Sequence, residues 1–335
     1  MMIIKDFSFY LTNFFNEYMP NHKNFSKNTI MLYRDCFILF FRFCEEYKNI
    51  NVDNLTFSYI SKDLILEYLS WLEITRNSSI QTRNQRLAAL KSFCKFVEFE
   101  APEFYDVCSS IRNIEPKKYE KSTSNYLSIE AMKLLLQQPN ADNKAELRDL
   151  ALLSLLYDSG ARVQEIIDLH ISNLTLQNKS TLHVIGKGQK AREIPINKST
   201  AKILKNYISL YGLVNSDYLF VNKYGKKLTR QGISYILNKY IIRAKEKYPE
   251  LFCNSITTHS CRHSKAMHLL EDGVNLIYIR DFLGHSSVST TEMYARANPE
   301  IRRTEIEKAS KMLISKSKFS ENKKSGLLMF LKDLI

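Results

Sequence analysis

Helical periodicity fills the first third of the chain and then stops at a polar, basic stretch, and this break constrains the fold more than any other feature. Apolar residues recur every three to four positions in five segments, at residues 7–18, 28–47, 61–73, 80–99 and 103–111. Residues 115–125, with the sequence EPKKYEKSTSN, lack such periodicity. We therefore predict an all-helical first domain over residues 1–114 and an interdomain linker over residues 115–126.

The sequence after the linker is again mostly helical, with one short β region. Helices are predicted from a cap at Ser128 to Leu136 and at residues 144–159, 198–211, 230–247, 258–271, 276–283 and 289–295. Short β signals lie at residues 181–185, 192–196 and 218–221, and a glycine-containing turn joins the first two. We predict a mainly α fold whose second domain, over residues 127–298, contains a small three-stranded antiparallel sheet.

Residues 299–335 form a predicted C-terminal tail. Residues 299–314 have the pattern of an amphipathic helix, and residues 327–335 are too apolar to remain uncovered in water. The tail could dock on its own domain or on a neighbouring subunit, and the sequence favours neither.

The charge balance indicates a polyanionic partner. The 335 residues include 48 Lys and Arg against 35 Asp and Glu, which gives a formal net charge of +13 and a pI near 9.3. Nucleic acid is the simplest partner for such a surface. Ribosome-associated and membrane-surface proteins would carry a similar charge, so the partner class needs further support.

Cysteine usage and hydropathy indicate the cellular setting. The six cysteines form no CxxC pair and most lie in apolar helical sequence, where cysteine behaves as a small hydrophobic residue. The chain has no run of eighteen apolar residues. We therefore expect a cytoplasmic protein without a membrane span.

Basic residues of the first domain are candidates for DNA contact. Lys27 and Arg34 are expected on the surface of the second predicted helix. On the fourth, Arg83 and Arg86 are expected to project outward while neighbouring leucines face the core. These four side chains could contact DNA phosphates, and the alternative is a solvated helix face.

Six chemically matched side chains follow one another in the second domain. Arg162 lies in GARVQE and Lys187 in GKG. His259 and Arg262 lie in THSCRH, at a spacing that places both on one helix face. The stretch LGHSSVSTTEMY supplies the last two, His285 and Tyr294.

These residue types suit metal-free phosphoryl transfer. Ionising a tyrosine at pH 7 costs about 4 kcal/mol, so a tyrosine nucleophile needs cationic neighbours or a base. Arginine stabilises the charge that develops on phosphate oxygens, because its planar guanidinium donates two parallel hydrogen bonds. Lys187, at the tip of a turn between glycines, could protonate the departing oxygen. No dense Asp, Glu and His cluster surrounds the motifs, so we expect no metal and no other cofactor.

Four further residues are candidates for DNA contact. Lys190 and Arg192 follow the GKG turn and could contact phosphates, or they could be solvated turn charges. Thr229 and Arg230 open a predicted helix, whose first amide groups could bind a DNA phosphate.

The ordered motifs resemble the active site of the tyrosine recombinases, the phage-integrase and Xer-type family of DNA strand-exchange enzymes. GARVQE, GKG, HxxRH and LGHxxxxTTxxY occur in family order and at similar separations, and no motif position departs from the pattern. The helical segments at residues 28–43 and 82–96 resemble the family's core-binding domain, which has a SAM-like fold. The resemblance thus implies the DNA breaking-rejoining fold over nearly the whole chain.

The resemblance also implies a role for each residue. Tyr294 would attack the scissile phosphate to form a 3′-phosphotyrosyl link. The other family positions would clamp the phosphate (Arg162 and Arg262), protonate the leaving 5′ oxygen (Lys187), assist proton transfer at the tyrosine (His259) and donate to a nonbridging oxygen (His285). Glu165, one turn after Arg162, would orient the site.

The family implies a site-specific recombinase that works as a tetramer on double-stranded DNA without ATP. Integration or excision of a mobile element, chromosome dimer resolution and inversion all use this chemistry. A type IB topoisomerase would share the tyrosine chemistry, and a DNA-binding accessory protein could keep the site without using it. The core-binding resemblance argues against the topoisomerase, and the complete set of motifs argues against the accessory protein.

Overall fold

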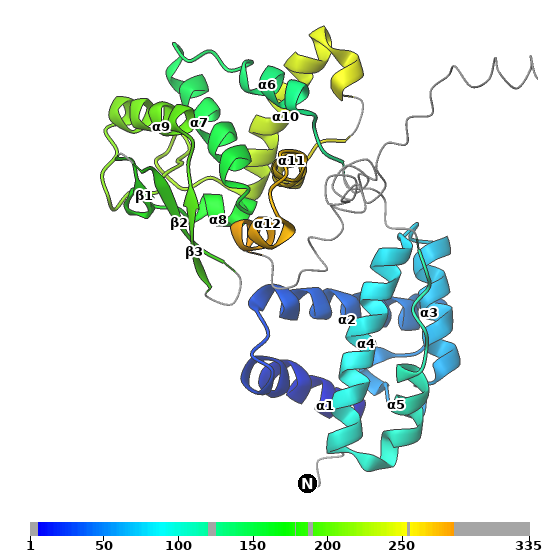
Figure 1. The fold of residues 1–335 in the computed structure, drawn as a ribbon. Coiled ribbons are helices and arrows are strands. Elements are labelled where there is room, and N and C mark those ends of the chain that lie inside the picture. Colours follow the sequence, from blue (N-terminus) through cyan, green and yellow to red (C-terminus); the bar gives the residue numbers. More distant parts are fainter. Residues whose placement is uncertain (1–5, 120–124, 178, 187–189, 253–254, 285–335) are drawn as a thin grey trace, which may run out of the picture. The chain divides into compact units, whose positions relative to one another are not determined.

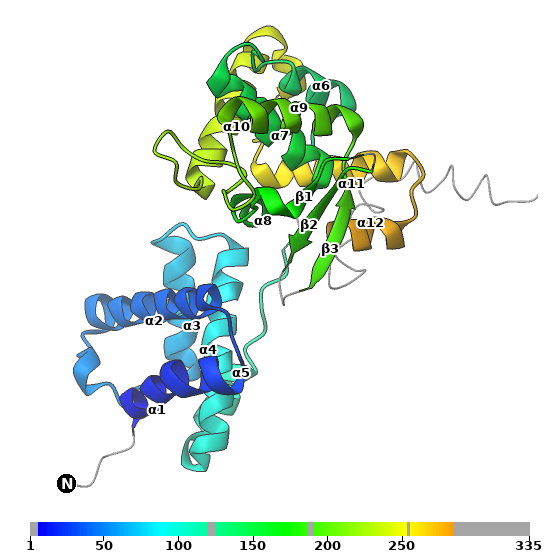
Figure 2. The ribbon, with the colours of Figure 1, turned by 90° about the vertical axis from the view of Figure 1, so that its left-hand side faces the viewer.

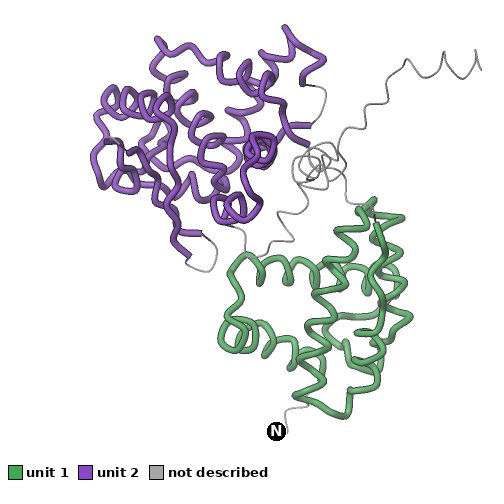
Figure 3. Tube along the Cα trace, viewed as in Figure 1, with its two compact units in different colours: residues 1–122 green, residues 123–335 purple. Residues whose placement is uncertain are grey.

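The chain divides into two compact units, Met1–Ser122 (unit 1) and Thr123–Ile335 (unit 2), shown in Figure 3. The computed structural model describes residues 6–119, 125–177, 179–186, 190–252 and 255–284. The boundary between the units lies within residues 115–126, the predicted linker. The predicted helices at residues 289–295 and 299–314, and the rest of the tail, lie outside the described residues.

Unit 1 is helical throughout its described part (Figure 1). Its elements are α1 (Phe7–Asn13), the π-helix η1 (Phe14–His22), α2 (Lys27–Lys48), the 3-10 turn η2 (Val52–Asn54), α3 (Lys62–Ile74), α4 (Ile80–Glu100), the 3-10 turn η3 (Pro102–Phe104) and α5 (Tyr105–Arg112). Serine side chains cap α2, α3 and α4 by accepting a hydrogen bond from the third residue of each helix. The predicted helices are confirmed, except that the first changes at Phe14, within its predicted range, to a π-helix that contains Pro20 and ends at His22.

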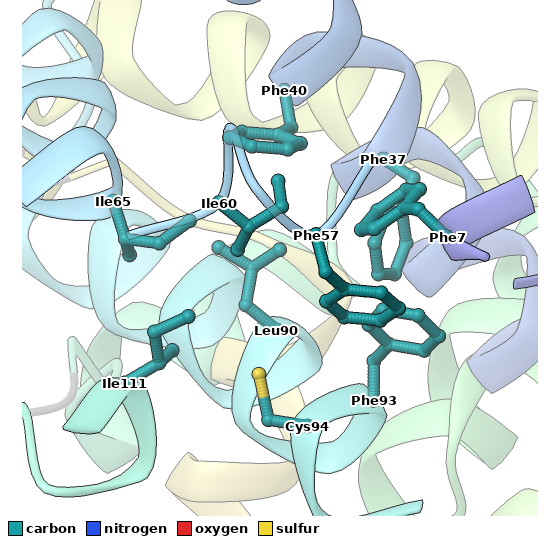
Figure 4. Close-up of a pocket in the computed structure, with 10 residues that line it drawn as sticks. All are labelled: Phe7, Phe37, Phe40, Phe57, Ile60, Ile65, Leu90, Phe93, Cys94 and Ile111. Atoms are coloured by element: carbon teal, nitrogen blue, oxygen red, sulfur yellow. The ribbon is translucent and has the colours of Figure 1, made fainter. Parts of the chain in front are cut away.

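Aromatic side chains dominate the core of unit 1. Phe93 of α4 packs against Phe7, Phe14 and Phe37 with ring centroids between 5.3 and 5.4 Å apart. A small cavity in this core is lined only by apolar side chains and the thiol of Cys94 (Figure 4). Such a void offers no polar partner to a ligand or a water molecule, so it belongs to the packing of the core.

Arg83 was predicted to project outward, and this prediction was wrong. Its side chain lies in the core of unit 1, where only 4% of Arg83 is exposed, and its Nε is 3.3 Å from Oε1 of Glu73. The reason lies in the helical spacing, because Arg83 precedes the buried Leu87 by four residues and Leu90 by seven. Arg86 is half-buried, whereas Lys27 and Arg34 are exposed as predicted, and Arg34 pairs with the adjacent Asp35.

Unit 2 combines helices with one small sheet. Its helices are α6 (Ile129–Leu136), α7 (Lys144–Ser159), α8 (Val163–Ile167), α9 (Lys198–Tyr211), α10 (Arg230–Lys247), α11 (Thr258–Glu271) and α12 (Leu276–Leu283), with 3-10 turns η4 (Ile171–Asn173) and η5 (Pro249–Phe252). The strands are β1 (Leu174–Thr175), β2 (Thr181–Ile185) and β3 (Ala191–Pro195), antiparallel and in the order β1-β2-β3. Figure 2 shows β3 beside α12. The predicted fold class is confirmed.

One strand prediction was wrong. Residues 218–221 form only isolated bridges, between His170 and Tyr218 and between Val221 and Lys227, and β1 supplies the third strand instead. Leu219 and Phe220 are fully buried, so their apolar signal reflected burial in the core and not pairing in a ladder.

The core of unit 2 surrounds α7. Leu152, Leu155 and Leu156 of this helix are completely buried, and the core extends to Leu182 and Ile194 of the sheet. The helix ends at Gly160, whose positive φ of 54° suits a residue without a side chain. The chain then turns directly into α8, and this turn positions the first residue of the candidate site. No helix in the described part of the chain is long and apolar enough to cross a membrane.

Candidate active site

Arg162 stands at the junction of α7 and α8. It is the N-cap residue of α8, and its backbone N–H donates to Oε2 of Glu165 at 2.7 Å. Its Nη1 donates to the other carboxylate oxygen, Oε1, at 3.0 Å. Glu165 thus holds both the backbone and the guanidinium of Arg162. The Arg162 side chain is 36% exposed, so part of its guanidinium can reach a ligand.

Arg262 projects from α11 toward the same junction. It is 1% exposed and donates from Nη1 to the carbonyl of Gly160 and from Nη2 to the carbonyl of Leu283, both at 2.8 Å. Thr257 and Ser260 form a reciprocal capping box that starts the helix and sets the direction of its first turn.

His259 lies one turn before Arg262 in α11. Burial, followed by the positive charges of Arg262 and Arg162, lowers the pKa of its imidazole. Both arginines therefore lie close enough to disfavour its protonation. Its ring packs edge-on against His263 with centroids 4.3 Å apart, and burial lowers the pKa of His263 to about 4. A neutral His259 can accept a proton near neutral pH.

Arg192 of β3 also lies in the site, a position for this side chain that was not predicted from the sequence. Its Nη1 and Nη2 donate to Oε1 and Oε2 of Glu165 at 3.1 and 2.8 Å, and its Nε donates to the carbonyl of Phe282 at 3.1 Å. The side chain is only 11% exposed. The interpretation of Arg192 as a solvated turn charge was therefore wrong, and its hydrogen bonds are directed into the protein.

The alternation of β3 contained the signal for this inward position. Arg192 pairs across the ladder with Val184, which is buried, and precedes the buried Ile194 by two residues. Side chains two apart in a strand share a face. Arg192 therefore belongs to the inner face of the sheet.

Glu165 is the only carboxylate that the described residues place in direct contact with these arginines. Its side chain is 7% exposed. Burial has the largest single influence and raises the pKa of Glu165. The hydrogen bonds from Arg192 and the Arg162 amide, with the charges of both arginines, outweigh burial, and the pKa is lowered overall. The carboxylate stays ionised as the centre of the network.

Two glycines allow the close packing around Arg192. A Cβ on Gly284 would lie 3.0 to 3.1 Å from three atoms of Arg192, and the φ of 65° at Gly284 also disfavours other residues. A Cβ on Gly186 would lie 3.2 Å from Nη1 of Arg192 and 3.4 Å from Oε1 of Glu165. These two glycines immediately precede Lys187 and His285 in the chain.

The structure thus gathers Arg162, His259, Arg262 and Glu165, and it adds Arg192 to them. Lys187, His285 and Tyr294 lie outside the described residues. Two guanidinium groups beside a neutral imidazole can bind the nonbridging oxygens of a phosphodiester and assist a proton transfer.

The remaining candidates are Thr229 and Arg230 at the start of α10 and Lys190 just before β3. Thr229 caps α10, with its hydroxyl accepting from the Gly232 N–H at 3.0 Å. Arg230 donates from Nε to Oε1 of Gln164 at 2.9 Å, so the first turn of α10 lies beside α8. Thr229, Arg230 and Lys190 are all exposed. Contact of these residues with DNA stays a prediction.

Known families match both units. Residues 125–300 match the model of the phage integrase family, and residues 12–100 match the model of its N-terminal SAM-like domain. The chain belongs to the phage integrase family of tyrosine recombinases, enzymes that break and rejoin DNA.

Several named relatives are similar over most of their length. A putative integrase/recombinase, y4rC of Sinorhizobium fredii, is 32% identical over 97% of each chain. The tyrosine recombinase XerD of Staphylococcus epidermidis is 33% identical over 82% of this chain and 90% of its own. XerC of Leptospira interrogans is 30% identical over 85% of this chain and 88% of its own.

Solved structures share the fold. The XerH recombinase bound to its difH substrate has a TM-score of 0.65 at 22% identity, covering 85% of this chain and 80% of its own. The integrase of the transposon Tn1549, in complex with a circular-intermediate DNA, has a TM-score of 0.68 at 16% identity, covering 89% and 98%. These likenesses establish the architecture of both units.

Proposed function

We propose that this recombinase cuts and rejoins DNA at specific sites through a covalent link between Tyr294 and a 3′ phosphate. The observation that carries the proposal is the convergence of Arg162 and Arg262 at the end of α12, with both guanidinium groups close enough to His259 to lower the pKa of its imidazole. In this arrangement the guanidinium groups bind the nonbridging oxygens and stabilise the charge that develops on them.

The reaction exchanges one ester bond for another. The Tyr294 hydroxyl oxygen attacks phosphorus while His259 takes the hydroxyl proton. The bond from phosphorus to the 5′ oxygen breaks, and Lys187 protonates that oxygen, leaving a 5′ hydroxyl. His285 donates a hydrogen bond to a nonbridging oxygen. Attack by a 5′ hydroxyl of the partner strand reverses these steps, so rejoining needs no ATP and no metal ion.

We further propose that the domains at residues 1–114 and 127–298 each bind duplex DNA, with residues 115–126 as the linker. Exposed Lys27, Arg34, Lys190 and Arg230 are the proposed phosphate contacts, together with the helix start at Thr229. Four copies assemble on two DNA sites in the cytoplasm, and the tail at residues 299–335 docks on its own domain or on a neighbouring copy. Strand exchange between two duplexes needs one nucleophile for each of four strands.

A covalent-capture experiment tests the chemistry. Duplexes enriched from a random-sequence pool by binding to the full chain supply the substrate, and a nick beside the cleavage position lets the released fragment diffuse away. The wild type should become attached to the 3′ phosphate, and peptide mapping should place the link at Tyr294. Tyr294→Phe should bind without attaching.

Tyr278→Phe is the matched control, because Tyr278 is a 70% exposed tyrosine on α12 and should leave attachment unchanged. Equal attachment by wild type and Tyr294→Phe would eliminate the proposed nucleophile. Relaxation of supercoiled plasmid of arbitrary sequence by a monomer would instead support the topoisomerase, which the relatives named as recombinases do not favour. Binding without attachment by the wild type would support the accessory protein.

A further inference from the structure

Three arginines from three different elements converge on the C-terminal end of α12. Arg192 of β3 donates to the carbonyl of Phe282 at 3.1 Å, and Arg262 of α11 donates to that of Leu283 at 2.8 Å. Arg162, at the start of α8, donates to the carbonyl of Gly284 at 3.2 Å. Figure 1 shows α12 close to α8 and α11.

The end of a helix favours such a cluster of cations. The last carbonyl groups of a helix accept no hydrogen bond from within the helix, and they lie at the negative end of the helix dipole. The amide of Gly284 closes the helix on Arg280 and Asp281, which leaves the following three carbonyls for the arginines. Each guanidinium therefore gains a charge-assisted hydrogen bond and holds α12 in place.

Arg192 differs from Arg162 and Arg262 in the partners of its two terminal nitrogens. Both of its terminal nitrogens donate to Glu165, the carboxylate that also binds the guanidinium and the amide of Arg162. A single side chain thus joins β3, the start of α8 and the end of α12. All three side-chain nitrogens of Arg192 donate within the protein, and its close packing against Gly284 leaves it little freedom to turn toward a ligand.

We propose that Arg192 is a positioning residue that anchors the end of α12 to the Glu165–Arg162 pair. This anchor fixes the position of Gly284, the residue before His285. The inference rests on the proposed function for its effect on cleavage. It replaces the prediction that Arg192 contacts a DNA phosphate. Loss of Arg192 should therefore impair the chemical step and not the attraction of DNA.

The test compares Arg192→Gln, Arg192→Lys and Glu165→Gln with Lys205→Gln, a control that removes an exposed cation from α9. Three quantities are measured: DNA affinity and its salt dependence, the single-turnover rate of covalent attachment at saturating DNA, and amide hydrogen exchange of residues 276–284 in the free protein. The free-protein measurement is independent of any reaction.

Arg192→Gln should lower the attachment rate about a hundredfold, because a displacement of about 1 Å at a reacting group has an effect of this size. Affinity should stay within about twofold of the wild type, and exchange in residues 276–284 should become faster. Arg192→Lys keeps a cation for Glu165 but cannot also reach Phe282, so its rate should be intermediate. Combining Glu165→Gln with Arg192→Gln should be little worse than the more damaging single change.

A phosphate contact would give the opposite result. Arg192→Gln would then weaken binding, reduce the salt slope by about one, and leave the attachment rate at saturation unchanged. Unchanged exchange in residues 276–284 would overturn the anchor directly. If Arg192→Gln fails to fold, Arg192→Lys and Glu165→Gln are compared with the wild type by the same three measurements. Failure of the wild type to attach would overturn the proposed function, while hydrogen exchange would still decide the anchor.

Discussion

Buried arginines occur in both units, and the charge around them differs. In unit 1, Arg83 lies against one carboxylate, Glu73, in the interface of α4 with α3. In unit 2, Arg162, Arg192 and Arg262 gather at the end of α12, and Glu165 is the carboxylate that the described residues provide there.

The difference separates a structural arginine from an anion site. A buried cation needs a negative partner, because burial removes its hydration. Arg83 has such a partner in Glu73, which also contacts Nζ of Lys117 at 2.9 Å. At the end of α12, the described residues bring three guanidinium groups and one carboxylate together, and a phosphate bound there would add negative charge beside the arginines. Burial, and then the charges of Arg262 and Arg162, lower the pKa of His259, so the two arginines add to the effect of burial on this imidazole.

The largest effect is expected from Arg262→Gln, which removes one of the two arginines proposed to clamp the phosphate. The rate of covalent attachment at saturating DNA should fall about a hundred- to thousandfold, as for the loss of a donor that stabilises transition-state charge. Single-turnover kinetics on the nicked duplex measure this rate, with Lys205→Gln as the control. A rate within a few fold of the wild type would remove Arg262 from the proposed phosphate clamp.

Acid should destabilise unit 2 before unit 1. Burial lowers the folded-state pKa values of His259, His263 and His268, that of His263 to about 4. The unfolded chain then binds more protons than the folded chain below pH 6.5, so stability falls as the pH is lowered from 6.5 toward 4. For His263 alone the loss is up to about 3 kcal/mol.

Two signals can follow the units during acid-dependent urea unfolding. Trp71, the single tryptophan of the chain, reports on unit 1 by fluorescence, and circular dichroism reports on both units. Between pH 6.5 and 5 the tryptophan transition should move less than the dichroism transition. His263→Gln should reduce the difference, and parallel movement of both transitions would contradict the assignment of these pKa shifts to unit 2.

Arg83→Gln should affect stability and not phosphate binding. It removes the buried cation from Glu73 and leaves the exposed Lys117 in contact with that carboxylate, at a cost of about 2 kcal/mol to the unfolding of unit 1. Tryptophan fluorescence during urea unfolding measures this change. The salt dependence of DNA binding should stay as in the wild type, whereas a slope reduced by about one would restore Arg83 as a phosphate contact.

Helix caps provide the smallest test. Ser79→Ala in unit 1 and Thr229→Ala in unit 2 each remove a capping hydrogen bond, and each should cost about 1 kcal/mol of stability. If the start of α10 binds a DNA phosphate, Thr229→Ala should also weaken DNA binding, and Ser79→Ala should not. Equal DNA affinities of the two variants would leave Thr229 with a capping role alone.

Local sequence predicted most of the described helices because their boundaries are encoded locally. The predicted limits of α7, α9, α10, α11 and α12 agree with the structure residue for residue. Asn143 and Thr229 cap helix starts, and Gly160, Gly212 and Gly284 adopt the left-handed conformation that ends helices. The third strand was misplaced because burial of residues 219–220 produces the same apolar pattern as a strand.

The sequence by itself determined the helical class of the protein and the order of its chemical motifs, since both depend on residue types and short spacings. Only the tertiary structure decided which carboxylate each of these cations contacts. Arg83 and Arg192 have the same residue type and were predicted to have the same role. The spacing within α4 and β3 places both side chains on an inner face, where each contacts a carboxylate from a different element, Glu73 on α3 and Glu165 on α8. Electrostatic partnership depends on distances that folding creates between remote segments, and no local pattern records them.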